Sequence, residues 1–546
     1  MTPTRRAVAT GGLALTAAGG WTRRADAVRF GSSFTVTGKN GPFIHQVAGR
    51  RFGWSPASGG ALGLASDAVN QGKYQQARLR MPYTEAAVSG LLERLRGQWP
   101  YAKGAPPRVF ILGVDYYNAY SLPDNSIVVA FGLLDHAGSD DEVAFVLGHE
   151  LSHLLLGHFG DRSAAAQRQQ ETASRLGQLF LVGSALSGAA GGAAGRLGAA
   201  VRDAGATSDM LQFLAGATAE EPHTQAQEDE ADAMGFDLSQ AAAYSAEDAS
   251  ATVFDTIQAD RDRRSQAIDA MKAQLKAQLS QVVSPSTVQS ILAGGWSSSN
   301  IRQGLFEGAA RVALSGAAAR GKGPAHRPPA ERKRGIAEYS AQAYPAGAPL
   351  RDEQHGWLQK VRSTTEFIQA RIAVDAVQDA MKARAIHNYA EATSQIGRAT
   401  RTSFGGAPMV LNEAARLRYD MGDVAGADRL FTRADASPDQ TVDGGIDHAR
   451  MLFEAGQNDR AMRVIQTAIK RFGDDDKPFL SLLIAVSLKD GRQDEADRYL
   501  QRCVAYNDAD LKHDCELAAG KTADQQAKPD ANKPSLPFHL PSLPHL

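Results

Sequence analysis

The sequence has little cysteine and almost no net charge, and each scarcity excludes a class of protein. Two cysteines among 546 residues cannot build a disulfide-dense scaffold or a four-cysteine zinc site, so any metal must be held mainly by histidine and carboxylate. With 59 basic against 60 acidic residues, no basic excess is available to neutralise phosphates, which argues against a nucleic-acid-binding protein. Apolar residues at 43% and charged residues at 22% are typical of a soluble globular chain rather than a polytopic membrane protein.

The first 27 residues have the order of a secretory signal. Arg5 and Arg6 precede a weakly apolar run, and an A-x-A cleavage pattern ends at Ala27. Paired arginines and weak hydrophobicity are typical of a twin-arginine signal. We therefore expect residues 1–27 to be removed and the rest to be periplasmic or otherwise exported across the cytoplasmic membrane. The alternative is a disordered basic N-terminus.

A 20-residue stretch from Leu176 to Gly195 carries no charge, so a transmembrane span has to be weighed. Its six large apolar residues contribute roughly 2–3 kcal/mol of insertion free energy, and six glycines, two serines and a glutamine oppose it. We predict a small-residue helix or mobile segment packed on the protein. Contact with a membrane stays open, but an integral span is not expected.

Apolar periodicity between residues 85 and 158 predicts a helix, two buried strands and a second helix. Glu85–Gln98 has helical spacing, while Val109–Val114 and Ile127–Phe131 are apolar runs of strand length separated by a turn signal. A capping box begins at Ser139 and opens a helix that we expect to run through His158 or beyond.

The second of these helices carries the pattern His-Glu-x-x-His. At about 100° per residue, His149 and His153 lie one turn apart on one face, so both imidazoles can reach one zinc ion. Glu150 projects toward an open coordination position, where it can accept a proton from zinc-bound water and pass it to the leaving amine. The alternative is a polar helix face with two ordinary histidines.

A zinc hydrolase needs a third protein ligand, and a later acidic run supplies a candidate. Glu228 and Asp232 are i and i+4 on a predicted helix, so they share a face. Glu228 is the candidate ligand, and Asp232 is the candidate partner for the free N–H of a ligand imidazole. A solvated helix face is the alternative for this acidic run. On a continuous helix His158 would point about 140° away from His153, which favours a structural role. His223 precedes the helix of Glu228 and is not expected to be a ligand.

These motifs resemble zinc metallopeptidase family 48, which includes the HtpX heat-shock, OMA-type and CAAX prenyl proteases. The resemblance covers roughly residues 85–335 and departs at a turn that usually bears glycine, at Gln225 and at Arg327. The matching elements are Gly148–His153, Glu228 with Ala231, Asp232 and Gly235, the runs 118–123, 127–129, 132–134 and 141–147, Pro222-His223-Thr224, and His326-x-Pro328-x-x-x-Arg332.

The resemblance implies one Zn²⁺ per chain, bound by His149, His153 and Glu228, with Glu150 as general base. His326 either occupies a fourth zinc position at rest or stabilises the oxyanion with Arg332, and a plain loop histidine is the alternative. The strand Ile127–Phe131 is a candidate sheet edge for an added substrate strand, or else a core strand. The candidate substrate-strand residues are Asn118, Ala119, Ile127, Val128 and Val129.

The C-terminal half contains a periodic pattern. Gly422, Gly456 and Gly491 are 34 and 35 residues apart, and an alanine follows each glycine after five positions. A period of about 34 residues is typical of tetratricopeptide helix–turn–helix repeats, which stack into surfaces that hold peptides or partner proteins. An ordinary antiparallel helical domain is the alternative. Cys503 and Cys515 lie near its end, where they either pair in an oxidising compartment or stay free.

We therefore expect a mainly α-helical chain with a small β-sheet, in which a zincin-like metallopeptidase domain precedes an α-helical tetratricopeptide-like repeat domain. The predicted function is a zinc metalloendopeptidase acting on misfolded or envelope proteins, with repeats that bind substrate or envelope assembly machinery. This order resembles the periplasmic beta-barrel assembly-enhancing proteases. The alternative is a repeat-based periplasmic chaperone or adaptor with latent or lost protease activity. The predicted segments are a signal at 1–27, an extension at 28–80, the peptidase at 81–345, the repeats at 346–520 and a disordered Pro-rich tail at 521–546.

Overall fold

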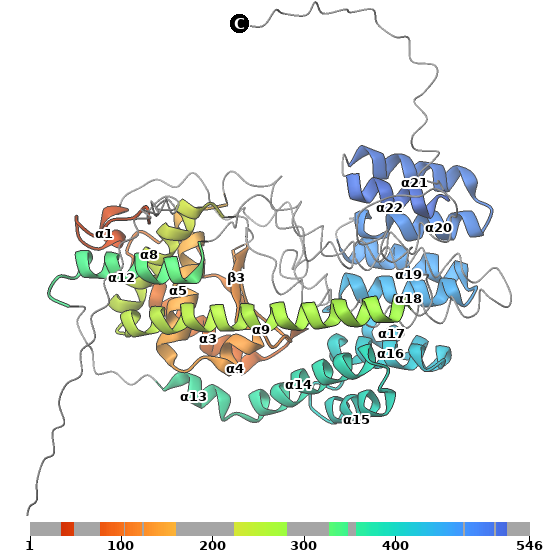
Figure 1. The fold of residues 1–546 in the computed structure, drawn as a ribbon, viewed down its shortest axis with the longest axis horizontal. Helices are drawn as coiled ribbons and strands as arrows, with labels where there is room; N and C mark the ends of the chain where they lie inside the picture. The colour runs from red at the N-terminus through yellow and green to blue at the C-terminus, as the bar shows by residue number, and fades with distance from the viewer. Residues whose placement is uncertain are drawn as a thin grey trace, which may run out of the picture. The chain divides into compact units, whose positions relative to one another are not determined.

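The computed structural model describes most of the peptidase region and the C-terminal helices (Figure 1). The predicted signal, the Leu176–Gly195 stretch, His326 and the Pro-rich tail lie outside the described residues. Among the helices that are described, none combines the length and the apolar character needed to cross a bilayer. The described ranges are 34–48, 77–102, 104–122, 125–159, 223–280, 327–347, 356–472, 476–506 and 509–520.

A four-stranded sheet with the order β1-β2-β4-β3 organises the N-terminal part. β2 and β4 are parallel, and β1 and β3 pair antiparallel on the outer sides. Of the two alternatives for Ile127–Phe131, the sheet edge is wrong and the core strand is the one observed, because β4 is paired on both sides and α4 begins at Phe131. Among the described strands, β3 is the edge beside β4. The strands are β1 (Arg78–Leu79), β2 (Arg108–Leu112), β3 (Ala119–Leu122) and β4 (Ser126–Ala130).

The turn between β3 and β4 explains one departure from the family pattern. Asn125 has φ of 62°, a left-handed conformation that asparagine tolerates better than most residues with a side chain. Its backbone N–H donates to the Leu122 carbonyl at 3.1 Å, and its side-chain amide donates to the Ala105 carbonyl at 3.1 Å. Asn125 thus takes the conformation for which a glycine is the usual choice.

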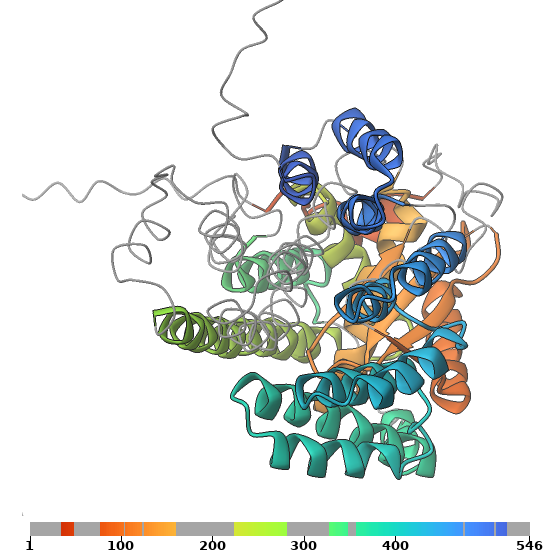
Figure 2. The same ribbon diagram turned by 90° about the vertical axis from the view of Figure 1, so that its right-hand side faces the viewer.

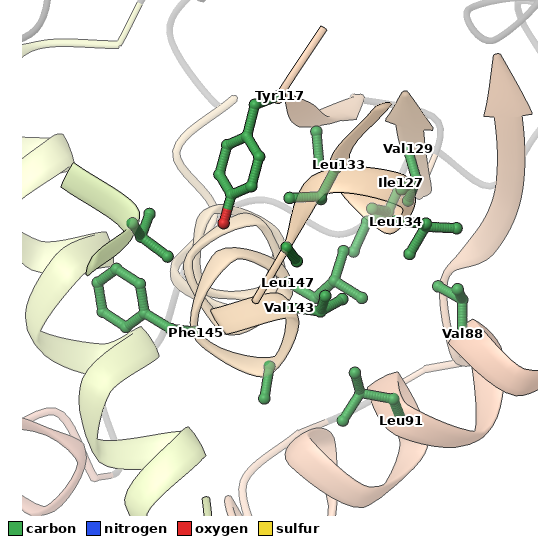
Figure 3. Packing of buried hydrophobic residues seen from close by; sticks show 14 of the residues in the cluster. Val88, Leu91, Tyr117, Ile127, Val129, Leu133, Leu134, Val143, Phe145 and Leu147 are labelled. Atoms are coloured by element: carbon green, nitrogen blue, oxygen red, sulfur yellow. The ribbon is translucent and has the colours of Figure 1, made fainter. Parts of the chain in front are cut away.

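The alternating side chains of β4 enter two apolar layers. Ile127 and Val129 pack with helices α3 (Pro82–Arg96) and α5 (Asp140–Leu156), whereas Val128 and Ala130 belong to a separate cluster. The first layer therefore fixes the helix that carries the His-Glu-x-x-His pattern against the sheet. Figure 3 shows this layer with Val88 and Leu91 of α3, Ile127 and Val129 of β4, and Val143 and Leu147 of α5.

Helix α5 begins where the sequence predicts but ends earlier. The Ser139 hydroxyl accepts from the Glu142 N–H at 3.2 Å, whereas the Glu142 carboxylate accepts from the Gly138 N–H and not from the capping residue. The helix ends at Leu156 because Gly157 takes a left-handed φ of 69°. His158 therefore lies beyond the helix, contrary to the prediction that the helix runs through it.

Helices α8 and α9 both pack against α5. Figure 1 shows α8 beside α5, and α9 as the long helix of the peptidase region. A capping box at Thr224 and Gln227 opens α8, so the acidic run from Glu228 starts in its first turn. The helices of this region not yet bounded are α1 (Phe43–Gln46), α4 (Phe131–His136), α8 (Gln225–Ala241), α9 (Ala246–Ser280) and α12 (Pro329–Ala343).

The segment at residues 34–48 docks on α8 through backbone hydrogen bonds to two buried carboxylates. The backbone N–H and hydroxyl of Thr35 donate to Asp229 at 2.8 and 3.0 Å. The backbone N–H of Ile44 donates to Asp237 at 2.9 Å, and the Tyr339 hydroxyl donates to the same oxygen at 2.7 Å. Asp229 and Asp237 thereby join this segment to α8, and Asp237 also joins it to α12.

The C-terminal part consists of helices that follow one another in pairs (Figure 2). The helices are α13 (Trp357–Arg362), α14 (Thr365–Ala385), α15 (Tyr389–Thr400), α16 (Pro408–Asp420), α17 (Val424–Asp435), α18 (Val442–Glu454), α19 (Asn458–Arg471), α20 (Leu480–Lys489), α21 (Gln493–Ala505) and α22 (Ala509–Ala518), with a 3-10 turn at Lys477–Phe479. A disulfide joins Cys503 of α21 to Cys515 of α22.

The left-handed turn within each helix pair occurs once more among the described helices than the glycine spacing predicts. Gly422, Gly456 and Gly491 have φ of 82°, 72° and 71°, and His387, 35 residues before the first, has φ of 57°. The alanine five positions after each turn is buried, including Ala392 after His387. The repeat therefore begins at α14 and α15, although its tetratricopeptide identity stays a prediction.

The start of the C-terminal part is anchored on α5. The Asp140 carboxylate, at the first position of α5, accepts from the backbone N–H groups of Trp357 and Leu358 at 3.0 and 2.9 Å. The rings of Phe131 and Phe367 lie 4.6 Å apart between centroids within the same core. The N-terminus of the helix that carries the histidine pair is thus joined to the first helix of the C-terminal part.

Candidate metal centre

Three buried side chains from α5 and α8 meet at one point. His149 Nε2 lies 3.1 Å from His153 Nε2. Glu228 Oε2 lies 3.5 Å from His149 Nε2, and Glu228 Oε1 lies 3.4 Å from His153 Nε2. The exposed fractions of His149, His153 and Glu228 are 7%, 1% and 0%. The structure thus brings together the three residues that the sequence nominates as ligands, and the group could hold a metal ion.

Two glycines allow α5 and α8 to approach closely enough for this meeting. A Cβ on Gly235 would lie 2.6 Å from the backbone nitrogen of His149, and one on Gly148 would lie 3.0 Å from the Gly235 carbonyl oxygen. Real Cβ atoms essentially never come as close as 2.6 Å, and 3.0 Å is tighter than nine in ten real Cβ contacts. Helices α5 and α8 therefore cross where Gly148 faces Gly235, and this close contact sets the distance from Glu228 to the imidazoles.

The second nitrogen of His149 faces a buried ion pair. His149 Nδ1 lies 2.9 Å from Asp232 Oδ1, and Asp232 accepts from Arg332 Nε at 2.8 Å and from Arg332 Nη2. The Arg332 guanidinium, on α12, also lies over the Phe254 ring at 4.8 Å from its centroid. A carboxylate held this way fixes a proton on Nδ1 of His149 and leaves Nε2 to face Glu228 and His153.

Burial and neighbouring charges together shift the pKa values of the two imidazoles in opposite directions. Burial lowers the pKa of His149, but hydrogen bonds to Asp232 and Glu228 outweigh burial and raise it to about 10. Burial lowers the pKa of His153 well below its usual value, and His223 adds to the effect. Burial favours a raised pKa for Asp232, but Arg332 outweighs it and holds that pKa below its usual value. A cation at this point therefore displaces a proton from His149 and meets a neutral His153.

Glu150 lies between the ligand group and the edge strand. Its Oε2 accepts from the backbone N–H of Ser121 at 2.8 Å and from the Ser121 hydroxyl at 3.0 Å. Its Oε1 lies 4.0 Å from His149 Nε2. Sequence reasoning assigned no role to Ser121. The signal available was a serine inside an otherwise apolar strand, and this serine is fully buried.

The candidate substrate-strand residues fall into two groups. Asn118 precedes β3 and its carbonyl accepts from the Ala130 N–H at 3.0 Å, so in the antiparallel ladder the backbone groups of Ala119 and Ser121 point to the outer side. Ala119 thus lies on the sheet edge nearest Glu150. Ile127, Val128 and Val129 lie on the interior strand β4 and are fully buried.

The structure gives Arg327 a role that explains its departure from the family pattern. Its guanidinium donates to both oxygens of Asp229 at 2.9 and 3.0 Å, and the same carboxylate holds Thr35. Arg327 and Asp229 are 4% and 0% exposed. Proline at this position would lose a buried, two-bonded ion pair.

A second histidine group adjoins the first but does not form a site. His153, His158 and His223 bring ring nitrogens within 4.8 Å of one another. The His153 and His223 rings are stacked, with centroids 3.7 Å apart and planes 15° apart. Because an imidazole nitrogen binds a metal in the plane of its ring, two stacked rings cannot both coordinate one ion.

Comparison with known proteins agrees with this geometry. The model of peptidase family M48 matches residues 85–299. The mitochondrial metalloendopeptidase OMA1 of Arabidopsis thaliana is 39% identical over 61 residues, which are 11% of this chain and 13% of that protein. The beta-barrel assembly-enhancing protease of Yersinia pestis is 27% identical over 139 residues, 26% of each chain. Both matches thus span a minor part of the relative's length. The ligand group therefore lies within the region of this chain, residues 85–299, that matches the metallopeptidases of family M48.

Proposed function

We propose that this chain is a zinc-dependent metalloendopeptidase. The short distances between the donor atoms carry the proposal. The two imidazole Nε2 atoms are 3.1 Å apart, Glu228 Oε2 is 3.5 Å from the nitrogen of His149, and Glu228 Oε1 is 3.4 Å from that of His153. With zinc–ligand distances of about 2.1 Å, neighbouring ligands of a tetrahedral ion lie about 3.4 Å apart. Two imidazoles and one carboxylate fit zinc and leave a fourth position, as catalytic zinc sites require.

The residues around the ligand group perform the proton transfers. Bound zinc supplies an electrophile that polarises the peptide carbonyl and acidifies water. Glu150 accepts a proton from the attacking water and passes it to the leaving amine nitrogen. One oxygen of Glu150 faces the ligand group while Ser121 holds the other, so the carboxylate keeps its orientation.

Arg332 acts mainly through Asp232 in this scheme. Its Nε and Nη2 both donate to the Asp232 carboxylate, which in turn holds His149. The sequence predicts that Arg332 stabilises the oxyanion with His326, but its Nε and Nη2 groups are already engaged by the Asp232 carboxylate. We therefore assign Arg332 to orienting the metal site, with His326 as the second oxyanion candidate.

An extended polypeptide is the substrate that fits the edge of the sheet. Among the described strands β3 is the edge beside β4, and Ala119 directs its backbone groups outward next to the Ser121 N–H, which donates to Glu150. A peptide added antiparallel to β3 would bring its carbonyl groups past the ligand group. Misfolded or unfolded chains of an exported compartment supply such segments, and the Yersinia pestis relative's name supports a role in beta-barrel assembly.

The helical pairs supply the second part of the proposed function. Repeated helix–turn–helix units from Thr365 to Ala518 form a surface suited to a protein partner, either a substrate or assembly machinery. The disulfide between Cys503 and Cys515 agrees with an oxidising compartment.

Removal and return of the metal tests the proposal. The full chain is assayed on unfolded casein as purified, after chelation, and after addition of one equivalent of Zn²⁺. We expect cleavage that chelation abolishes and zinc restores. An absence of metal-dependent cleavage, with retained binding of unfolded protein, would instead support a chaperone or adaptor with lost protease activity.

A further inference from the structure

His158 lies directly behind the ligand His153. The left-handed Gly157 ends α5 and turns the chain back, so that His158 Nδ1 lies 2.9 Å from His153 Nδ1. The two rings are 72° apart, which suits an in-plane hydrogen bond rather than stacking. On its other side His158 Nε2 lies 3.3 Å from Glu230 Oε2.

Metal binding leaves one arrangement of protons along these contacts. When Nε2 of His153 faces the metal with its lone pair, the neutral ring carries its hydrogen on Nδ1. That hydrogen requires a bare acceptor, so Nδ1 of His158 is unprotonated and its hydrogen lies on Nε2. The Nε2–H of His158 then donates to Glu230. His153 thus donates to His158, and His158 donates to a carboxylate farther from the metal site.

Both metal-facing imidazoles therefore have a carboxylate behind them. Asp232 contacts His149 directly, whereas Glu230 reaches His153 through His158. We propose that His158 is a positioning residue that holds His153 in the tautomer and ring orientation for metal binding, with Glu230 as the final acceptor. This inference rests on the proposed zinc site.

His223 plays a different part from His158. It stacks on the face of His153 at 3.7 Å, so it restricts the tilt of that ring without receiving its Nδ1 proton. Without the His158 contact, His153 would stay packed, but the tautomer with its hydrogen on Nε2, which cannot bind the metal through that atom, would be populated. Partners of this kind behind metal ligands contribute about 10- to 100-fold to metal affinity.

Two amide substitutions at this position separate the hydrogen bond from packing. In asparagine the side-chain oxygen lies about where histidine has Nδ1, whereas in glutamine the amide lies near the position of Nε2. His158→Asn thus keeps an acceptor for His153 and His158→Gln does not. The zinc dissociation constant of the full chain, measured by competition with a fluorescent chelator, is the readout. Thermal unfolding of the metal-free proteins controls for folding.

We expect His158→Gln to weaken zinc binding about 10- to 100-fold and His158→Asn to recover most of that loss. Glu230→Gln, on the partly exposed end of the relay, should cause a smaller loss and provides a second test if a His158 variant does not fold. Wild-type affinity in His158→Gln, or equal losses in the two His158 variants, would overturn the inference. A wild-type chain that binds no zinc would overturn the zinc site itself, and this inference with it.

Discussion

The backbone N–H of Ser121 donates to the Glu150 carboxylate over 2.8 Å, and the Ser121 hydroxyl donates to the same oxygen over 3.0 Å. The edge of the sheet and the proposed general base are therefore joined directly. Because the Ser121 N–H points to the outer side of β3, a peptide added to this edge would meet Glu150 at the same backbone position.

Replacement of Ser121 by alanine should lower kcat with little change in KM. The substitution removes the hydroxyl bond to Glu150 and keeps the backbone bond, so the carboxylate is held by one donor instead of two. A hydrogen bond to a charged group is worth about 1.5–3 kcal/mol, which corresponds to at least about a tenfold loss of rate. Ser121→Thr, which retains the hydroxyl and suits a strand, should stay close to wild type in peptide hydrolysis. A Ser121→Ala variant with unchanged kcat would show that the hydroxyl does not orient Glu150.

Replacement of Gly235 by alanine should disrupt the metal site. The new Cβ would lie 2.6 Å from the His149 nitrogen, so α8 has to move away and carry Glu228 with it. We expect weaker zinc binding and a loss of about 1–3 kcal/mol in unfolding free energy. Gly90→Ala is the matched control, because Gly90 lies inside helix α3 with open space around its Cβ position, and alanine there should be neutral or stabilising. Wild-type zinc affinity in Gly235→Ala would contradict the role given to the glycine crossing.

The stability of the chain should fall as the pH rises through the titration of Asp237. Burial raises the pKa of Asp237 from 3.8 to about 6, although hydrogen bonds from Ile44 and Tyr339 oppose the shift. The folded state then binds the proton more tightly than the unfolded state, so this stabilisation is complete below pH 3.8 and is lost as the pH passes 6. A shift of this size corresponds to roughly 3 kcal/mol.

Urea unfolding between pH 4 and pH 7 measures this effect. Asp237→Asn cannot titrate, so the decline attributable to this position should disappear in the variant. An unchanged pH dependence in Asp237→Asn would show that the carboxyl is not the source.

Local periodicity was enough to place the candidate ligands on helix faces, whereas their assignment to one metal ion came from the family resemblance. His149 and His153 are one helical turn apart, and Glu228 and Asp232 are one turn apart on the later helix, so each pair shares a face in any intact helix. The mainly helical architecture with a small sheet is confirmed for the same reason, since it follows from long periodic segments.

Features that depend on distant pairing or on single backbone angles were not predictable. The identity of the edge strand depends on the pairing of β2 with β4, although β3 lies between them in the sequence. The apolar run Ile127–Phe131 does not reveal this pairing. The position of His158 depends on the left-handed Gly157. The glycine spacing does not reveal the turn at His387, because this histidine occupies a left-handed position that glycine holds in the later repeats.

The most direct test of the account compares the wild-type chain with Glu150→Gln. Both proteins should contain one zinc ion, because glutamine leaves His149, His153 and Glu228 unchanged. Wild type should cleave unfolded casein, and Glu150→Gln should be slower by about 10²- to 10⁴-fold, the usual contribution of a general base. Equal cleavage by the two zinc-loaded proteins would contradict the assignment of Glu150 and, with it, the proposed reaction.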